Sequence, residues 1–107
     1  MSVVMVYITA SSPEEAEKVG RLLVEKRLAA CVNIIAGMRS IYWWEGKLDQ
    51  AEETVLIAKT KESLVDELVR SVKDVHDYTV PCVVALPVVA GNPDFISWIK
   101  QETKGAE

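Results

Sequence analysis

Three side chains with soft or borderline metal-binding atoms stand out in the sequence: Cys31, His76 and Cys82, the only cysteines and the only histidine. A structural zinc site needs four ligands at close spacing, and neither cysteine belongs to a C-x-x-C pair. A thiolate–imidazole site could therefore form only by convergence in the fold or between subunits, and its soft donors would suit copper. We predict all three as candidate ligands for copper or another divalent metal ion. Folding does not require that metal, because 107 residues can build a core without it.

Each of these residues also has a purely structural interpretation. His76 falls at the predicted C-terminus of a helix, where a cation suits the helix dipole, and a free cysteine usually packs as a small hydrophobic side chain. A cysteine nucleophile would need His76 as its base. No glycine-rich phosphate loop precedes Ser11 and Ser12, and no acid–base pair of carboxylates stands out. The sequence therefore predicts a protein that is not an enzyme.

The aromatic segment at positions 41–44 points to a contact surface. Tyr42, Trp43 and Trp44 are consecutive, so on a strand they point alternately to opposite faces and cannot all enter one core. Tyrosine and tryptophan supply large contact areas at low entropic cost, which is typical of interfaces. We predict an oligomer interface that includes Ile41, Tyr42, Trp43 and Trp44. The alternative is one core aromatic with an incidental surface neighbour.

Apolar periodicity predicts the elements that position these residues. In chain order they are a strand at 3–9, a helix from Ser12, strands at 31–35, 40–44 and 53–59, a helix through 64–75 capped by Thr60, a strand at 82–89 and a helix from Asn92. Gly37 indicates a bulge and residues 45–47 a hairpin turn. Pro87 favours an edge position for the last strand. The polar tail after Lys100 is expected to fray.

The order β-α-β-β-α-β with a final helix predicts an α+β fold. It is typical of a ferredoxin-like, four-stranded antiparallel sheet with a C-terminal helix. Both crossover helices lie on one face, so the other face has no helix of its own. An apolar face left bare in water favours aggregation, so we expect a partner or a ligand to cover it. The chain is 50% hydrophobic, which is high for so small a domain and is a first indication of an oligomer. Residues 1–107 form a single domain, since two cores need a longer chain.

Charge and hydropathy argue against several classes of function. The net charge is −4, the pI is near 5.0 and no basic stripe is present, so a nucleic-acid partner is not expected. No run approaches the roughly 20 apolar residues of a membrane span, and the N-terminal segment lacks the features of a signal peptide. Two cysteines without a secretory signal favour a reduced, cytoplasmic location.

Taken together, several short stretches resemble the CutA divalent-cation tolerance family. They are LAACVNI at 28–34, SIYWWEGK at 40–47, AKT at 58–60, HDY at 76–78, VP at 80–81, and GN at 91–92 leading into WI at 98–99. The resemblance covers nearly the whole chain. It implies a ferredoxin-like fold packed as a homotrimer with interlocking hairpins, in a cytosolic protein linked to tolerance of copper and other divalent metals. The family's candidate metal ligands carry over onto Cys31 and His76.

Two positions depart from the family pattern. Asp77 stands where the family often has proline, which relaxes the expected geometry around His76. Cys82 stands where the family often has glutamate after the Val-Pro step, so a soft sulfur replaces a carboxylate and favours copper(I).

An alternative function on the same fold is a small-molecule sensor akin to PII-type signalling proteins, with ligands in clefts between subunits. A nucleotide would need basic side chains that converge on its phosphates, and the candidates are Arg39, Lys47 and Lys59. An acylphosphatase-like hydrolase would need an arginine in the loop after the first strand, and residues 10–13 contain none.

Overall fold

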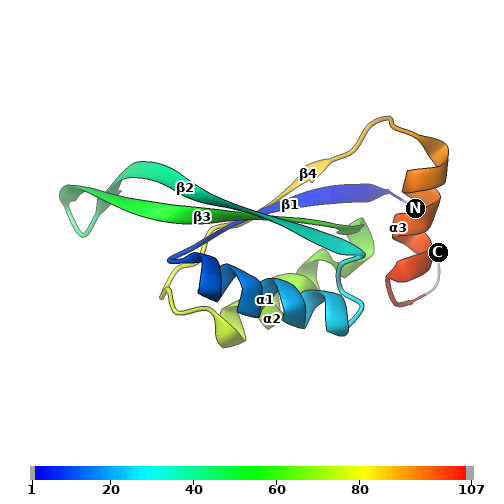
Figure 1. The fold of residues 1–107 in the computed structure, drawn as a ribbon, viewed down its shortest axis with the longest axis horizontal. Helices are drawn as coiled ribbons and strands as arrows, with labels where there is room; N and C mark the ends of the chain where they lie inside the picture. The colour runs from blue at the N-terminus through cyan, green and yellow to red at the C-terminus, as the bar shows by residue number, and fades with distance from the viewer. Residues whose placement is uncertain (1, 106–107) are drawn as a thin grey trace.

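Residues 2–105 of the chain are described by the computed structural model. The elements are β1 (Val3–Ala10), α1 (Pro13–Glu25), β2 (Cys31–Trp44), β3 (Lys47–Lys61), a 3₁₀ helix η1 (Glu62–Leu64), α2 (Val65–Val75), β4 (Val83–Pro87) and α3 (Pro93–Glu102). Figure 1 shows them in place. The predicted order of strands and helices is confirmed, and the fold is α+β.

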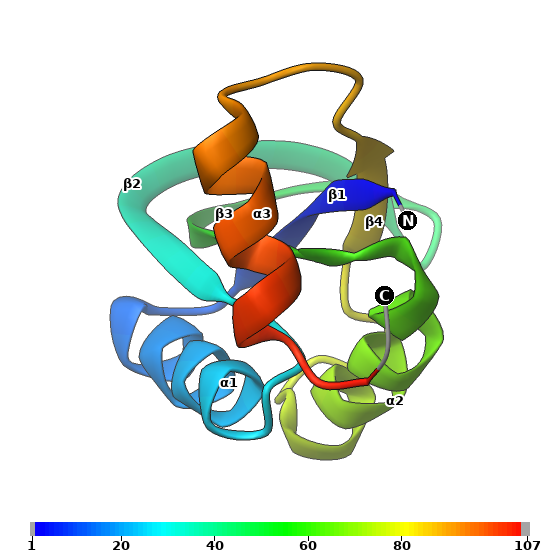
Figure 2. The same ribbon diagram turned by 90° about the vertical axis from the view of Figure 1, so that its right-hand side faces the viewer.

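The four strands form one antiparallel sheet in the order β2-β3-β1-β4, which is the ferredoxin-like order. Helices α1 and α2 lie on the same face of this sheet (Figures 1 and 2). The core lies between these helices and the sheet, and its fully buried members include Val6, Ile8, Leu23, Leu56 and Leu68. Because side chains alternate along a strand, the odd-numbered residues of β1 face the other way.

The long hairpin of β2 and β3 is shaped by the glycines that the sequence indicated. The register of the two strands shifts between Ile35 and Met38, and Gly37 within that bulge has φ +85°. Glu45 and Gly46 close the hairpin with φ +51° and +80°. Positive φ at both central residues is the conformation that a tight hairpin turn requires.

The start of α1 agrees with the sequence-based prediction, whereas the start of α2 does not. The Ser12 hydroxyl accepts the Glu15 N–H at 3.1 Å, so the predicted cap of α1 is confirmed. The prediction that Thr60 caps the second helix was wrong. β3 continues to Lys61, which pairs with Val3 of β1, because the ladder with β1 keeps this segment extended beyond Thr60.

The distal part of the β2–β3 hairpin extends past both helices (Figure 1). We call residues 39–52 the arm. Its strands pair from Arg39–Glu52 to Trp44–Lys47, and it lengthens the subunit to 44 Å against 26 and 22 Å in the other directions. Neither α1 nor α2 covers the arm.

The face of the sheet opposite α1 and α2 is apolar and exposed, and we call it the uncovered face. Met5, Ile35, Val84 and Leu86 are 37–54% exposed there. Helix α3 stands at one end of the sheet, near the start of β1 and the end of β3 (Figure 2). The expectation of a sheet face without its own helices is therefore confirmed.

Residues 101–105 of the C-terminal tail are held by specific contacts, so the prediction that the tail frays was wrong for this part, and residues 106 and 107 lie outside the described residues. Helix α3 continues to Glu102, and Thr103 is buried. The Lys104 N–H donates to the Arg27 carbonyl at 2.9 Å, and the Arg27 guanidinium donates to the Glu102 carboxylate at 2.8 Å. Polar residues stay fixed here because distant carbonyl and charged groups pair with them.

Candidate metal-binding site

The three predicted ligands occupy two different ends of the sheet. His76 Nε2 lies 2.7 Å from the carbonyl oxygen of Thr9, and the Cys82 carbonyl accepts the Thr9 N–H at 3.4 Å. Cys31 begins β2 opposite Lys59. Lys59 lies four residues, or about 13 Å, along β3 from Val55, the partner of Thr9. Within one subunit, the fold brings His76 and Cys82 to the end of β1 and leaves Cys31 apart.

His76 is buried and both of its ring nitrogens are occupied. It ends α2, with its N–H on the Val72 carbonyl at 2.8 Å. A carbonyl can only accept, so Nε2 donates its hydrogen to Thr9. Nδ1 accepts the Tyr78 N–H at 3.0 Å. The ring is therefore the neutral Nε2–H tautomer, and a metal would have to displace one of these two partners.

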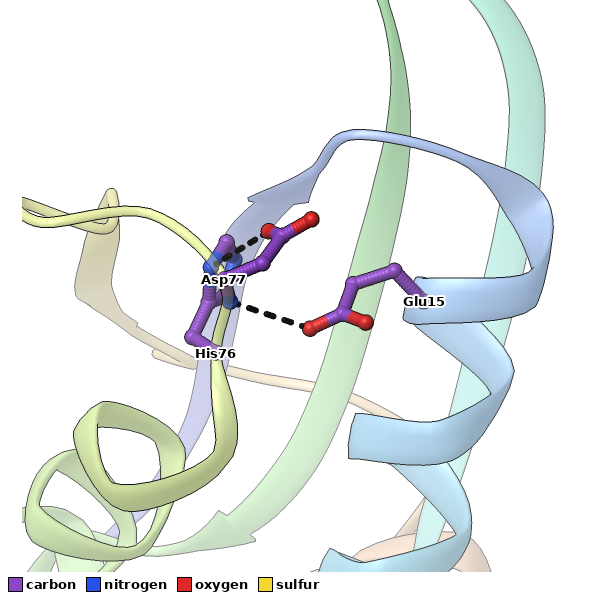
Figure 3. Close-up of side chains that lie close together, drawn as sticks. All are labelled: Glu15, His76 and Asp77. Carbon is purple, nitrogen blue, oxygen red and sulfur yellow. Dashed lines mark hydrogen bonds and ion pairs between the residues drawn. The ribbon is translucent and has the colours of Figure 1, made fainter.

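Glu15, His76 and Asp77 form a group that the sequence did not indicate. Their potential ligand atoms all lie within 4.8 Å of one another, and Figure 3 shows the three side chains facing each other. The Glu15 carboxylate accepts the Asp77 N–H at 3.1 Å, and the Asp77 carboxylate accepts the Ser11 hydroxyl at 2.6 Å. These bonds tie the loop after α2 to the start of α1, so the group has a structural role already.

A second group lies around Glu53, at the base of the arm. Glu53 is buried, with 8% of its surface exposed, and its carboxylate accepts the Tyr78 hydroxyl at 2.6 Å. The Tyr78 ring also packs on the His76 ring, with 4.8 Å between centroids. Burial, the hydrogen bond to Glu53 and the negative charge of Glu53 hold the pKa of Tyr78 well above its usual value.

Glu53 also influences the thiol of Cys82. Cys82 is exposed as a residue, but partial burial of its thiol raises the pKa, and the charge of Glu53 raises it further. In the isolated subunit the thiol of Cys82 therefore stays protonated, and it is a weak nucleophile. The sequence could not single out Glu53, because it is one of sixteen acidic residues.

The predicted interface residues lie on the arm and are exposed in the subunit. Ile41 and Trp43 are 70% and 74% exposed, and Tyr42 and Trp44 are 37% and 44% exposed. Strand alternation places Ile41 and Trp43 on one face of the arm and Tyr42 and Trp44 on the opposite face. None of the four enters the core of the subunit.

The basic residues considered for a nucleotide do not converge within one subunit. Lys47 and Lys59 lie twelve residues apart on β3, roughly 40 Å in an extended strand. Arg39 lies opposite Glu52 on the arm, and the Lys59 ammonium donates to the Asn33 side chain at 2.6 Å. One chain therefore offers no cradle for phosphates from these three side chains.

Across residues 2–105, no helix combines the length and the apolar character needed to cross a membrane. The chain is a small α+β protein with a ferredoxin-like sheet and an aromatic arm. Its candidate soft-metal donors His76 and Cys82 lie together at the end of β1. Residues 4–102 match the family described as CutA1 divalent ion tolerance protein. The chain belongs to this family.

Two relatives illustrate the similarity. The divalent-cation tolerance protein CutA of Archaeoglobus fulgidus is 46% identical over 96 residues, which cover 90% of this chain and 93% of that protein. CutA 1, chloroplastic, from Oryza sativa subsp. japonica is 44% identical over 101 residues, which cover 94% of this chain. The chain spans only 57% of the rice protein's own length.

Solved structures of the same two relatives have the same fold. The crystal structure of CutA1 from Oryza sativa superposes with a TM-score of 0.95 at 42% identity, covering 99% of this chain and 97% of that one. The structure described as the periplasmic divalent cation tolerance protein CutA from Archaeoglobus fulgidus gives 0.92 at 43% identity, covering 95% and 99%.

Proposed function

We propose that this protein is a homotrimeric, non-catalytic metal-binding protein of the cytoplasm that contributes to tolerance of divalent cations, with copper as the metal. Membership of the CutA1 divalent ion tolerance family is the observation that carries this proposal. Copper is favoured by the two thiols, which are soft ligands. The free thiols also favour a reducing compartment, although relatives are named for the chloroplast and the periplasm.

Support for the homotrimer comes from apolar surface that the subunit does not bury. The uncovered face and the arm both expose large apolar side chains, among them Ile35, Trp43 and Leu86. Soluble monomers rarely leave contiguous apolar surfaces of this kind in water. Further copies of the chain are the simplest cover for both surfaces, with Ile41, Tyr42, Trp43 and Trp44 as anchors.

The metal ligands that we propose are Cys31, His76 and Cys82. A site that combines Cys31 with His76 needs two subunits, because they lie at opposite ends of the sheet in one chain. His76 can join only after it releases Tyr78 or Thr9. The absence of catalysis is supported by the same geometry, since His76 has no spare nitrogen to activate a thiol.

Native mass measurement combined with an anaerobic copper(I) titration tests the proposal. We expect a mass near three times 11.9 kDa and copper binding that is lost in the triple variant Cys31→Ser/Cys82→Ser/His76→Ala. Unchanged copper affinity in that variant would contradict the ligand assignment and leave the trimer standing. A monomeric mass at micromolar concentration would contradict the trimer. A nucleotide-dependent rise in melting temperature would instead favour the sensor alternative.

A further inference from the structure

Glu53 is a buried carboxylate without a cationic partner among residues 2–105. Its residue surface is 8% exposed, and its side chain accepts a hydrogen bond from the neutral hydroxyl of Tyr78 at 2.6 Å. None of the ion pairs in this part of the chain includes Glu53. A carboxylate removed from water is costly unless an opposite charge compensates for it. The position of Glu53 therefore requires a cation from elsewhere.

The basic side chains of the same hairpin do not reach this carboxylate. Met38 is the pairing partner of Glu53, and Arg39 is the next residue of β2. Because side chains alternate along a strand, Arg39 lies on the opposite face of the hairpin from Glu53. Lys47 and Lys59 each lie six residues from Glu53 along β3, which is about 20 Å in an extended strand. That separation exceeds the combined length of the two side chains.

The carboxylate lies on a surface that we expect a second copy to cover. Leu56 points into the core, so strand alternation places Glu53 and Val55 on the uncovered face. Glu53 directly follows the arm in β3. Tyr78 is held by the bond from its N–H to His76 at 3.0 Å, so its hydroxyl fixes the carboxylate in place. A carboxylate has about four acceptor positions, and Tyr78 fills one of them.

The arm carries two cations that are also unpaired. Arg39 and Lys47 are exposed, and neither takes part in an ion pair among residues 2–105. They flank the aromatic side chains at positions 42–44 that we predict as interface anchors. Lys59 differs from them, because its ammonium already donates to the side chain of Asn33 at 2.6 Å. An element of the expected interface thus holds the charge that Glu53 lacks.

We propose that Glu53 and Tyr78 of one copy receive a cationic side chain, Arg39 or Lys47, from the arm of a second copy. The inference rests on the proposed homotrimer and deepens it, because the carboxylate site is complete only in the assembly. A guanidinium or ammonium group in this site donates hydrogen bonds to Glu53 and balances its charge. The contact also selects the orientation of the copies, since any packing that omits the cation leaves a buried charge uncompensated.

Double-mutant cycles on the assembly test this contact. Sedimentation measures the protein concentration at which half of the assembly dissociates, and we expect Glu53→Gln to raise this concentration by about tenfold or more. For the arm cation that enters the site, Arg39→Gln or Lys47→Gln should have a similar effect. Its combination with Glu53→Gln should then be less than additive, because both changes remove the same pair. Glutamine still accepts the Tyr78 hydroxyl, and an unchanged circular dichroism spectrum verifies that Glu53→Gln folds.

Two variants serve as matched controls. Glu52→Gln removes the adjacent, exposed carboxylate and should shift the dissociation midpoint by less than about threefold. Lys59→Gln removes a cation of the uncovered face and should combine additively with Glu53→Gln. Additive effects of Glu53→Gln with both Arg39→Gln and Lys47→Gln would overturn the inference and leave the trimer intact. Coupling between Glu53 and Lys59 would overturn the arm as the source of the cation. An unmodified protein that is monomeric would contradict the proposed homotrimer as well.

Discussion

The two halves of the β2–β3 hairpin differ in what covers them, although the same strands form both. In the half beside α1, Leu56 and Ala58 are fully buried. In the arm, Trp43 and Leu48 pair across the strands and are 74% and 65% exposed. Apolar side chains occur in both halves, so the difference comes from the reach of the helices. The covered half therefore stabilises the subunit, whereas the arm adds little to its core.

The strongest test of this contrast is Leu56→Ala in the covered half. Leu56 is fully buried in the core cluster, and removing its terminal carbons leaves a cavity. We expect a loss of about 3 kcal/mol in the free energy of unfolding, measured by urea denaturation at fixed protein concentration. Leu56→Met keeps the volume and should cost less than about 1.5 kcal/mol. A loss below that limit in Leu56→Ala would show that the core tolerates cavities here.

Trp43→Ala tests the other half of the contrast. Because Trp43 is mostly exposed in the subunit, the variant should fold normally but associate weakly. As an interface anchor, Trp43 should contribute about 2 kcal/mol per contact to assembly, which is roughly a 30-fold change in dissociation constant. Sedimentation over a range of concentrations measures this change. A variant that remains assembled at the same dilution as the unmodified protein would remove the arm from the interface.

Local signals were enough to predict the elements, because each acts within a few residues. The cap at Ser12 and the bulge at Gly37 are of this kind. The sequence could not predict the group around Glu53, because that group forms between residues that are distant in the chain. Tyr78 and Glu53 lie 25 positions apart. Glu52 and Glu53 are adjacent, and alternation alone sends one to each face. Only the register and the loop that carries Tyr78 decide which carboxylate becomes buried.

Gly20→Ala measures how closely α1 approaches the covered half. A Cβ at Gly20 would lie 2.9 Å from Val32 Cγ2 and 3.2 Å from Leu56 Cδ1. Alanine normally gains about 1 kcal/mol over glycine in a helix. Overpacking costs about 1–3 kcal/mol, and the β-branched Val32 has little rotamer freedom. We expect a net loss of about 1 kcal/mol in thermal unfolding experiments.

A double variant provides the control for this contact. Combining Gly20→Ala with Val32→Ala removes the clash, so the helix propensity of alanine should then stabilise the protein relative to Val32→Ala alone. A stabilised Gly20→Ala single variant would show that the helix and the sheet separate easily at this point.

The smallest expected effect concerns residues 101–105 of the C-terminal tail, which are polar, unlike the aromatic arm, and are held in place through Arg27 and Glu67. The hydrogen bond from the Lys104 ammonium to Glu67 lowers the pKa of that carboxyl below its ordinary value of 4.5. A carboxyl with a lowered pKa in the folded state stabilises the protein above pH 4.5, and this contribution is lost as the pH falls through the lowered value.

In Lys104→Met the pKa of Glu67 should rise, as measured by NMR titration of the carboxyl carbon, and the pH dependence of stability should flatten in this range. Arg21→Met, which breaks an ion pair within α1, should leave the pKa of Glu67 unchanged. If the pKa of Glu67 is also unchanged in Lys104→Met, the tail is not held against α2, and the part of the chain that is held in place ends at α3.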